Sequence, residues 1–378
     1  MFRGHPRRNA IRSTVVWLCF GAGDSFGQAG SAVPEALRGK EITEYFHAYV
    51  EAPGSTPDAV LQADNNLEIV FACREPRGAG ELNQLSAPVL SSQLLLLESW
   101  GLLSRTEGER FQTKFPIIGP PQSEELRKIA RTTAIKLAGE LESDVRAFGG
   151  LLAARRWEPS AFSILFSLVL DDLVWEELEQ QRVIQPRKPA PEHPFWVGTI
   201  WILYPARAFV TGTNTVSEKG VALKINWSPS ALPSLGILLT GEGMQSLFSA
   251  AASPSPAVSE EVRKQFQGYG IFDDVGHWRV PRLTADAKHD EVYSASRRMA
   301  ERIAHLLHDA FPDKDMERLM PYSTRSDRVV IAYHEIMWDL LEEWDRSGLV
   351  PTPRVLKGEG ERKNVGSLVF VIAEPPPP

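Results

Sequence analysis

Cysteine and long apolar segments are both scarce in this sequence of 378 residues. The chain holds two cysteines, Cys19 and Cys73, and only Cys73 would remain after removal of an N-terminal segment. A single cysteine cannot form an internal disulfide, and in the apolar stretch LEIVFAC it is predicted to be a small core residue rather than a nucleophile. No stretch reaches the roughly 18 consecutive apolar residues that a membrane-spanning helix needs. The sequence therefore predicts neither an internal disulfide in a processed chain nor a transmembrane segment.

The signatures of common catalytic and cofactor sites are also missing. The sequence has no Gly-x-Ser-x-Gly, no phosphate-binding GxxxxGK[ST] and no GxGxxG after a strand. YHEIMW, at Tyr333 to Trp338, lacks the second histidine that a zinc protease places four positions after the first. His305 and His308 share a helix face beside Asp309, but no third ligand is identifiable, which favours a solvated polar face over a metal site. We expect no catalytic, cofactor-binding or metal-binding residues.

Two pairs of neighbouring acids and four tryptophans are assigned structural roles. Asp171-Asp172 precedes the predicted helix that contains Trp175, and Asp273-Asp274 lies in a turn, so capping and turn formation explain both pairs. Tryptophans that fall at the ends of predicted elements are assigned to core packing rather than to a cage that stacks on a ligand. These tryptophans are Trp100, Trp175, Trp278 and Trp338.

Negative charge exceeds positive charge, with a formal net charge of −7 and a pI near 5.7. A content of 43% hydrophobic and 24% charged residues is typical of a soluble globular protein, and the length predicts about two domains. An acidic chain repels a polyanion unless its basic residues are concentrated on one face. The composition therefore disfavours nucleic acid as a partner.

The N-terminal residues follow the order of an export signal. MFRGHPRRNAIR carries four arginines, STVVWLCFGAG is apolar, and small residues follow at Gly27 and Ala29 or at Gly30 and Ala32. Cleavage after residue 29 would lower the basic residues from 41 to 37 and the acidic residues from 48 to 47, for a net charge of −10. We expect a bacterial protein exported to the periplasm or the medium. A frayed cytoplasmic terminus and a mis-assigned start codon are the alternatives.

Two parts of the chain resemble each other. SWGLLSRTEGERFQTKFPI parallels GYGIFDDVGHWRVPRL, with Gly101 matching Gly270. The amphipathic segments that follow, EELRKIARTTAIKLAGELESDV and DEVYSASRRMAERIAHLLHDAF, align at an offset of 166. Their apolar residues recur every three or four positions, which predicts one buried stripe on a long helix. The matched positions are Leu126 with Val292, Ile129 with Ala295, Thr133 with Met299, Leu137 with Ile303, Leu141 with Leu307, and Val145 with Phe311.

The similarity continues through a second helix and a strand. LVLDDLVWEELEQQ parallels IAYHEIMWDLLEEW, with Trp175 matching Trp338, and VGTIWIL parallels VGSLVFV, with Gly198 matching Gly366. The offsets differ by only a few residues because changes of length in loops cost little. Chance similarity between amphipathic helices is the alternative, but the shared order of four elements favours an internal duplication.

We predict an α+β fold of two repeats, each with a long amphipathic helix, a second helix containing tryptophan and a C-terminal strand. The first repeat spans 37–205 and the second, more degenerate repeat spans 228–374. Residues 1–29 are the expected signal peptide, and 375–378 form a disordered PPPP tail. Residues 206–227 are predicted to form two strands around GTNTVSEKG, which either extend the sheet of the first repeat or bridge the repeats.

Residues 65–118 resemble a winged helix-turn-helix of the broad ArsR/MarR type. The segment reads as helix DNNLEIVFACRE, breaker PRGAG, short helix ELNQLS, helix VLSSQLLLLESWG after Pro88, and a two-stranded turn centred on Glu107-Gly108-Glu109. Members of this family that bind DNA place the second helix of the motif in the major groove and the wing on the backbone. The resemblance implies that the DNA-binding residues would be Ser91, Ser92, Gln93, Arg105, Arg110 and Lys114.

A surface for reading DNA is missing from this winged-helix-like unit. Residues 89–100 contain no Lys, Arg or Asn, and Glu98 is their only charged residue. The three cations of the wing are opposed by Glu107 and Glu109, and the second repeat loses about eight residues at the position of the short helix. Base readout needs donor and acceptor side chains, and phosphate contact needs cations. We therefore expect no DNA binding, and a helix that is sandwiched between others because nearly every face is apolar.

Three functions remain open from the sequence. The leading hypothesis is an exported, non-enzymatic bacterial protein whose winged-helix-like repeats bind a protein or a small ligand. The second is a cytoplasmic winged-helix transcriptional regulator, which would require an unforeseen basic surface. The third is an enzyme whose site is assembled between the repeats.

Overall fold

The computed structural model describes residues 32–52, 55–186, 195–218, 220–231, 242–252, 259–267, 271–272, 277–286, 288–359 and 368–372. Over these residues the fold is mixed α+β, as predicted. The expected signal peptide (1–29), the PPPP tail and the Asp273-Asp274 pair lie outside the described residues.

The described elements alternate short helical units, strands and long helices. The helices are α1 (Pro57–Leu61), α2 (Asn66–Ala72), α3 (Ala79–Leu82), α4 (Ser91–Ser99), α5 (Gln122–Ala154), α6 (Ala161–Ser163), the π-helix η4 (Ile164–Leu173), α7 (Val174–Gln180), α9 (Glu242–Ala252), α10 (Glu260–Gln267), α11 (Glu291–Ala310), α12 (Asp313–Leu319) and α13 (Arg325–Arg346). Short 3-10 turns are η1 (Glu35–Leu37), η2 (Ile42–Glu44), η3 (Glu158–Ser160) and η5 (Arg354–Lys357). The strands are β1 (Phe46–Glu51), β2 (Arg77–Gly78), β3 (Leu103–Thr106), β4 (Arg110–Thr113), β5 (Ile117–Ile118), β6 (Val197–Leu203), β7 (Gly212–Glu218), β8 (Val221–Trp227), β9 (Arg282–Thr284) and β10 (Leu368–Ile372).

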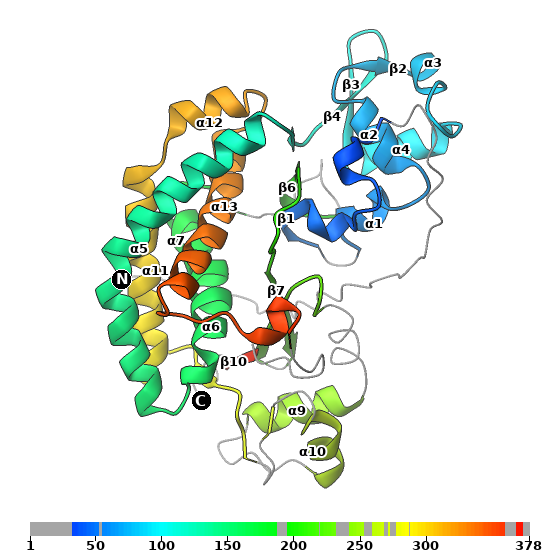
Figure 1. Cartoon of the computed structure of the whole chain (residues 1–378). Helices are drawn as coiled ribbons and strands as arrows, with labels where there is room; N and C mark the ends of the chain where they lie inside the picture. Colours follow the sequence, from blue (N-terminus) through cyan, green and yellow to red (C-terminus); the bar gives the residue numbers. More distant parts are fainter. Residues whose placement is uncertain are drawn as a thin grey trace, which may run out of the picture.

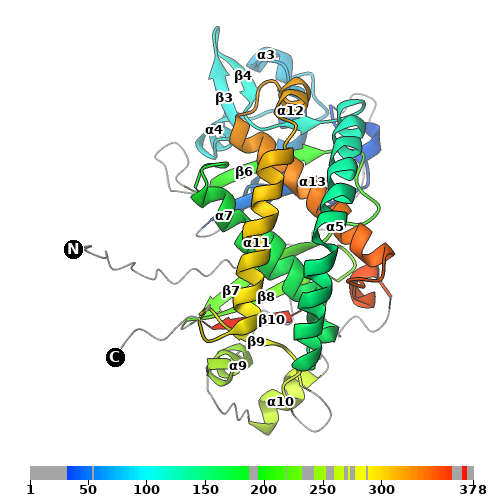
Figure 2. The same ribbon diagram turned by 90° about the vertical axis from the view of Figure 1, so that its left-hand side faces the viewer.

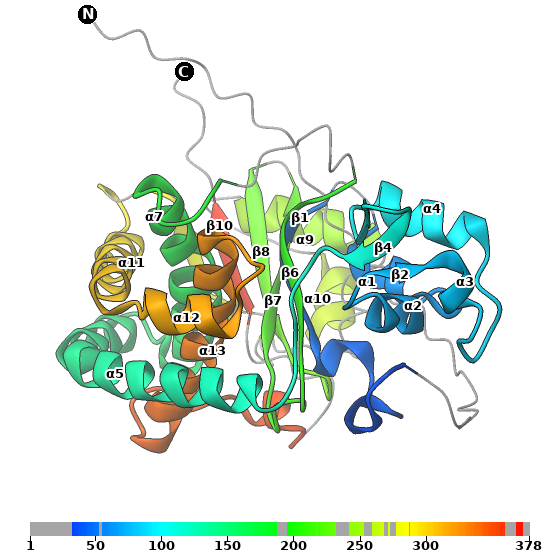
Figure 3. The same cartoon turned by 90° about the horizontal axis from the view of Figure 1, so that it is seen from above.

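The molecule has a layer of long helices on one side of a strand layer. Seen from above, α5, α7, α11, α12 and α13 lie on one side of β1, β6, β7, β8 and β10, and α1 to α4 lie on the other (Figure 3). In Figure 1 the strands run down the middle, with the small helices α9 and α10 below them. In Figure 2, α11 lies in front, α5 lies beside it and α13 passes behind; α5 contacts both α13 and α11.

Two sheets of the strand layer share one pairing pattern. In the first, β6 pairs antiparallel with β1 and parallel with β5. In the second, β10 pairs antiparallel with β8 and parallel with β9, and β7 is added at the edge beside β8. Of the two alternatives for residues 206–227, extension of the first sheet is wrong, because β7 and β8 belong to the sheet of β10; bridging between the repeats stays a prediction.

Each of these two sheets packs against a different hydrophobic core on each of its two faces. Trp201 of β6 is buried with the long helices, whereas its neighbours Ile200 and Ile202 are buried with α2 and α4. In β10, Val369 faces the long helices, and Phe370 packs with residues of α9 and α10. Successive residues of a strand point to opposite faces, so each sheet is covered on both sides.

The long helices carry the buried stripes that the sequence predicts. Leu137 and Leu141 of α5 are 2% and 0% exposed, and Ile303 and Leu307 of α11 are 0% and 5% exposed. The two stripes do not pack mainly on each other. Instead α5 packs along α13, and α11 packs along η4 and α7.

The segment from α2 to β4 is the one whose sequence resembles a winged helix. Helices α2, α3 and α4 are followed by the hairpin β3–β4, and the strand order is β2-β4-β3. Gly108 and Glu109 at the tip of the hairpin have φ of 72° and 57°, as a tight turn between antiparallel strands requires. Helix α4 begins at Ser91 rather than directly after Pro88.

Helix α4 is not sandwiched between other helices, contrary to the expectation from its composition. Its inner face buries Leu94 and Leu97, but Leu95 and Leu96 are 64% and 38% exposed among the described residues. Sequence periodicity could not assign the faces, because leucine occupies both the inner and the outer positions.

Candidate functional site

A cavity of about 450 Å³ lies where the edges of the two sheets meet the helical layer. It is lined by residues of β1, of β7 with the preceding loop, of η4 and α7, and of α13. Volumes of this size are typical of pockets for small molecules, and such pockets form preferentially between structural units.

The helix η4 supplies the acidic wall of the cavity. Residues Ile164–Leu173 form a π-helix that continues directly into α7, so Asp171 and Asp172 lie inside a helical run. The prediction that this pair caps a helix is therefore wrong. π-helical turns are rare, and those found within α-helices are frequent at functional sites. Asp172 pairs with Lys224 of β8 at 2.8 Å, and Lys224 is 5% exposed.

Asp171 is the carboxylate with the most altered acidity in the cavity. Its Oδ1 accepts a hydrogen bond of 3.2 Å from Trp175 Nε1. Burial raises the pKa of Asp171 to about 6, although hydrogen bonds from Trp175 and Thr213 and the charge of Lys224 act to lower it. Carboxyl groups with a raised pKa inside a cavity are candidates for binding or proton transfer.

Two histidines, His47 of β1 and His334 of α13, line the cavity and are each 7% exposed. His334 Nδ1 lies 2.9 Å from the carbonyl oxygen of Val330, so Nδ1 carries the proton and Nε2 presents a lone pair when the ring is neutral. His47 packs against Trp201 and Trp338, and neither of its ring nitrogens has a hydrogen-bond partner among the described residues. Burial lowers the pKa of His47 to about 3 and that of His334 to about 4. Both rings are therefore neutral at neutral pH.

Aromatic rings form much of the remaining wall. Trp175 and Trp338 are 1% and 5% exposed, which confirms that they pack in the core, and both also line the cavity. Tyr49 lies 4.3 Å from Trp175 between ring centroids. Trp338 Nε1 donates to the carbonyl oxygen of Thr211 at 2.8 Å, which fixes the ring at the edge of β7. The other two predicted core tryptophans, Trp100 and Trp278, are only half-buried.

A buried ionic network lies behind Trp338. Arg207, in the connection between β6 and β7, contacts Glu335 at 2.8 Å and Asp339 at 2.5 Å, and its guanidinium lies 5.6 Å from the ring of Trp338. Arg127 of α5 reaches the same Glu335 oxygen at 3.2 Å. Burial raises the pKa of Glu335, opposed by the charges of Arg207 and Arg127. The network holds one wall of the cavity in place and binds α5 to α13.

The residues that the winged-helix resemblance implies for DNA do not form a free cationic surface. Gln93 is 6% exposed and bonds to the backbone of Leu90 and to Asn65, whereas Ser91 and Ser92 are exposed.

The cations of the wing contact acidic or carbonyl groups of the same unit. Arg105 pairs with Glu98 at 2.8 Å and with Glu109. Arg110 pairs with Glu81 at 2.8 Å and donates to the carbonyl oxygen of Pro76. Lys114 is exposed, so one cation of the three faces solvent without an acidic neighbour among the described residues.

The other candidates for chemistry stay apart from the cavity. His305 and His308 are 72% and 55% exposed and lie 3.5 Å and 3.4 Å from Asp309. No group of three His, Cys, Asp or Glu side chains suited to a metal ion occurs among the described residues. Cys73 is fully buried, and burial raises the pKa of its thiol to about 12, so it remains a protonated core residue.

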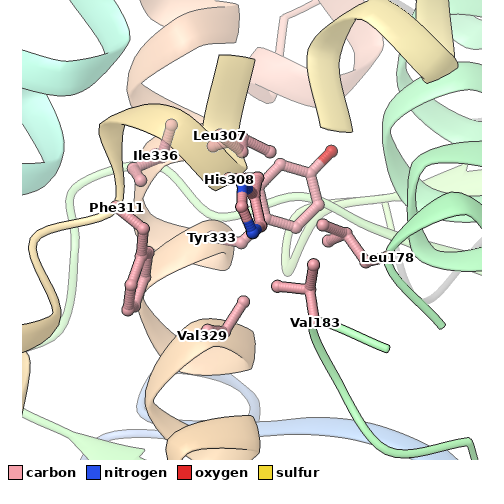
Figure 4. Close-up of a pocket in the computed structure, with 8 residues that line it drawn as sticks. All are labelled: Leu178, Val183, Leu307, His308, Phe311, Val329, Tyr333 and Ile336. Carbon is pink, nitrogen blue, oxygen red and sulfur yellow. The ribbon is translucent and has the colours of Figure 1, made fainter. Parts of the chain in front are cut away.

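A second, much smaller gap of about 10 Å³ lies between α7, α11 and α13 (Figure 4). Leu178, Val183, Val329 and Phe311 point toward it. Such a gap is about the size of one water molecule and lacks the polar partners that a water needs. It is an imperfection of core packing rather than a ligand site.

Comparison of the chain with protein-family models, with curated proteins and with solved structures gives no match. The function must therefore be inferred from the cavity itself. Within the part of the chain that the structure describes, no helix combines the length and the apolar composition needed to cross a bilayer.

The paired acids Asp171-Asp172 are visible in the sequence but are assigned a capping role there, and no sequence motif indicates His47 or Lys224. The one signal available was the repeat alignment, since the offset of 163 that matches Trp175 with Trp338 also matches Asp171 with His334. Both members of each pair line the cavity.

Proposed function

We propose that this protein is a non-enzymatic binding protein built from two winged-helix-like repeats, and that a small ligand occupies the cavity between them. The observation that carries the proposal is the cavity of about 450 Å³ with His47 in its wall. His47 has no hydrogen-bond partner among the described residues, so its ring nitrogens are available to a ligand in the cavity.

The shared strand pattern supports the duplication. Each central strand, β6 or β10, has one antiparallel and one parallel neighbour that come from corresponding places in the chain order. His47 lies opposite Trp201 in the first sheet, and Lys224 lies opposite Val369 in the second. Trp201 and Val369 are 168 residues apart, which is the offset found for Gly198 and Gly366.

This correspondence moves the proposed boundary between the repeats. Strand β8 takes the place in the second repeat that β1 takes in the first, so the second repeat would begin before Val221 rather than at residue 228. A ligand in the cavity would then contact equivalent elements of both repeats, as in many pockets between domains. The winged-helix-like unit α2–β4 would serve as a structural cover for the first sheet, with its wing cations paired internally.

A fragment screen with a blocked cavity tests the binding proposal. We expect members of a library of cationic, neutral and anionic fragments to quench the fluorescence of the tryptophans that line the cavity. Thr215→Phe places a ring in the cavity from β7 and should abolish these responses. Thr132→Phe, on an exposed position of α5, is the matched control. Equal responses from the Thr215→Phe variant, or none from the unaltered protein, would refute the proposal.

A second candidate is an enzyme with its site between the repeats, and Asp171 favours it. A carboxyl group with a pKa of about 6 that lines the same cavity as two neutral histidines is suited to proton transfer near neutral pH. Turnover of a fragment that binds in the cavity, lost in Asp171→Asn while binding persists, would place this candidate first. Binding without turnover would support the leading proposal.

We also propose that the protein is exported, on the basic, apolar and small-residue order of its first residues. Expressed in a bacterium with its native start, it should lose about 29 residues and leave the cytoplasm. Recovery of an intact Met1 or Phe2 terminus in the cytoplasmic fraction would contradict export and strengthen the regulator alternative.

A further inference from the structure

We infer that the cavity takes a small organic cation, a protonated amine on an apolar or aromatic body, with Asp171 as its counter-charge. The inference rests on the proposed function and specifies the chemical class of the ligand. Its basis is the distribution of charge, hydrogen-bond acceptors and aromatic rings over the cavity wall.

Charge in the cavity wall is predominantly negative. Its ionisable carboxylates are Glu51, Asp58, Asp171 and Asp172, and Lys224 is its one cationic residue among those described. Lys224 is already paired with Asp172 at 2.8 Å. The cavity therefore has a surplus of negative charge and no uncommitted cation with which to hold an anionic ligand.

Asp171 is the carboxylate best placed to meet a ligand. It accepts a hydrogen bond from the neutral indole of Trp175, and no described cationic side chain lies within ion-pair distance of it. A carboxylate withdrawn from water without a counter-ion is destabilising, and pairing with a cation removes much of that penalty. Burial is the main cause of the raised pKa of Asp171, and the charge of Lys224 opposes it only in part.

Other polar atoms of the cavity wall can accept hydrogen bonds from a donor on the ligand. The Nε2 atom of neutral His334 is an acceptor, because Nδ1 donates to Val330. The hydroxyls of Thr213 and Thr215 on β7 also line the cavity and can accept hydrogen bonds. A protonated primary amine has three N–H donors, so a carboxylate, an imidazole nitrogen and a hydroxyl can satisfy all of them.

Aromatic rings complete the match. Trp175, Trp338, Tyr49 and Trp227 line the cavity, and of these Trp338 already has the Arg207 guanidinium 5.6 Å from its ring. The faces of such rings attract cations, and the attraction grows when water is excluded. The same rings offer an apolar surface for the body of the ligand, which distinguishes this cavity from a site for a hydrated metal ion.

Three probes of similar shape and different charge test the inference on the full chain at neutral pH. These are 2-phenylethylamine, 2-phenylethanol and phenylacetate, titrated by calorimetry. We expect the amine to bind at least about tenfold more tightly than the alcohol and phenylacetate to bind least. Asp171→Asn should weaken the amine at least about tenfold and leave the alcohol unchanged. Asp144→Asn, in an exposed pair with Arg302, is the matched control and should change neither affinity.

The outcomes separate this inference from the proposed function. Binding of the alcohol or phenylacetate as tightly as the amine, blocked by Thr215→Phe, would overturn the cationic class and keep the cavity as a ligand site. The same conclusion follows if the amine does not bind while other fragments of the screen do. Failure of every fragment in the screen would instead overturn the proposed function. If the Asp171→Asn variant binds the alcohol as tightly as the unaltered protein does, the variant is folded. A loss of amine affinity in that variant then supports the inference.

Discussion

Helix α5 packs on α13, and α11 packs on α7. The two contacts are similar in their apolar packing but differ in how deeply their charged side chains are buried. Arg131 of α5 reaches Glu343 of α13 at 3.1 Å, and Arg297 of α11 reaches Glu176 and Glu177 of α7, each at 2.7 Å. Arg131 and Arg297 are separated by the same 166 residues as the two buried stripes. Only the α5–α13 contact adds a further arginine from a strand connection.

That added residue, Arg207, changes the physical character of its contact. The side chains of Arg207 and Glu335 are 9% and 0% exposed, whereas those of Arg297 and Glu176 are 23% and 49% exposed. Exposed ion pairs contribute little, but removing one partner of a buried pair leaves an uncompensated charge. The stability of two similar helix pairs can therefore depend on charge to very different extents.

Removal of Arg207 should therefore give the largest loss of stability. Arg207→Met leaves Glu335 and Asp339 without their shared cation and should lower the free energy of unfolding by about 3–5 kcal/mol. Arg297→Met should cost less, because water screens Glu176, whose side chain is 49% exposed, although that of Glu177 is only 9% exposed. Urea denaturation at neutral pH measures both. Similar losses for the two variants would remove the distinction between the contacts.

Apolar truncation should affect the two contacts almost equally. Leu137→Ala in α5 and Ile303→Ala in α11 each remove a fully buried side chain and should cost about 2–5 kcal/mol. The same denaturation experiment applies, and Ile135→Ala, at a position 49% exposed on α5, is the control. A neutral result at either buried position would show that its helix packs through another face.

A fall in pH should lower the stability of the fold through His334 and raise it through Asp171, the residue that the repeat alignment matches with it. The folded-state pKa values of His47 and His334 lie below the usual 6.5, so the unfolded chain binds more protons and stability is lost as the pH falls below 6.5. Asp171 has a pKa raised from 3.8 to about 6, so its protonation favours the folded state over that interval. Two histidines against one carboxyl give a net loss of about 1.4 kcal/mol per pH unit between pH 6 and 4.

Replacement of one histidine should flatten this dependence. His47→Gln leaves one histidine to oppose Asp171, so the contribution of these residues to the slope should fall close to zero. His305→Gln, at a side chain 72% exposed, should leave the slope unchanged. Thermal unfolding followed from pH 7 to pH 4 provides the measurement. An unaltered slope in His47→Gln would mean that His47 is protonated in the folded state.

The sequence predicted those parts of the fold that depend on local periodicity. The stripes containing Leu137 and Ile303, the hairpin at Gly108 and the burial of Cys73 follow from spacing and residue type. The sequence could not show that α5 packs along α13 rather than along α7 of its own predicted repeat, because an apolar stripe does not specify its partner.

The cavity was less predictable than the helices. His47 and Asp171 come from elements 124 residues apart in the chain, and no short motif joins them. Asp171 was interpreted as a cap because two adjacent acids are common at helix starts, and nothing in the local sequence indicates a π-helix. Sites assembled by tertiary packing carry no spacing signature, whereas a loop or helix motif does.

The smallest expected effect concerns DNA and the wing. Non-specific affinity for a duplex comes from cations that replace counter-ions on the phosphates, and strong complexes use about six to ten such contacts. Arg105 and Arg110 are paired with carboxylates of the same unit, which leaves Lys114. The exposed face of α4 presents Leu95 and Leu96, which have no donor or acceptor for the edge of a base. A mobility-shift titration with mixed genomic fragments at physiological salt should show no sub-micromolar binding, and changing Arg105, Arg110 and Lys114 to Glu should alter nothing. Tight binding that weakens steeply with salt and disappears in this triple variant would instead make the regulator the leading function.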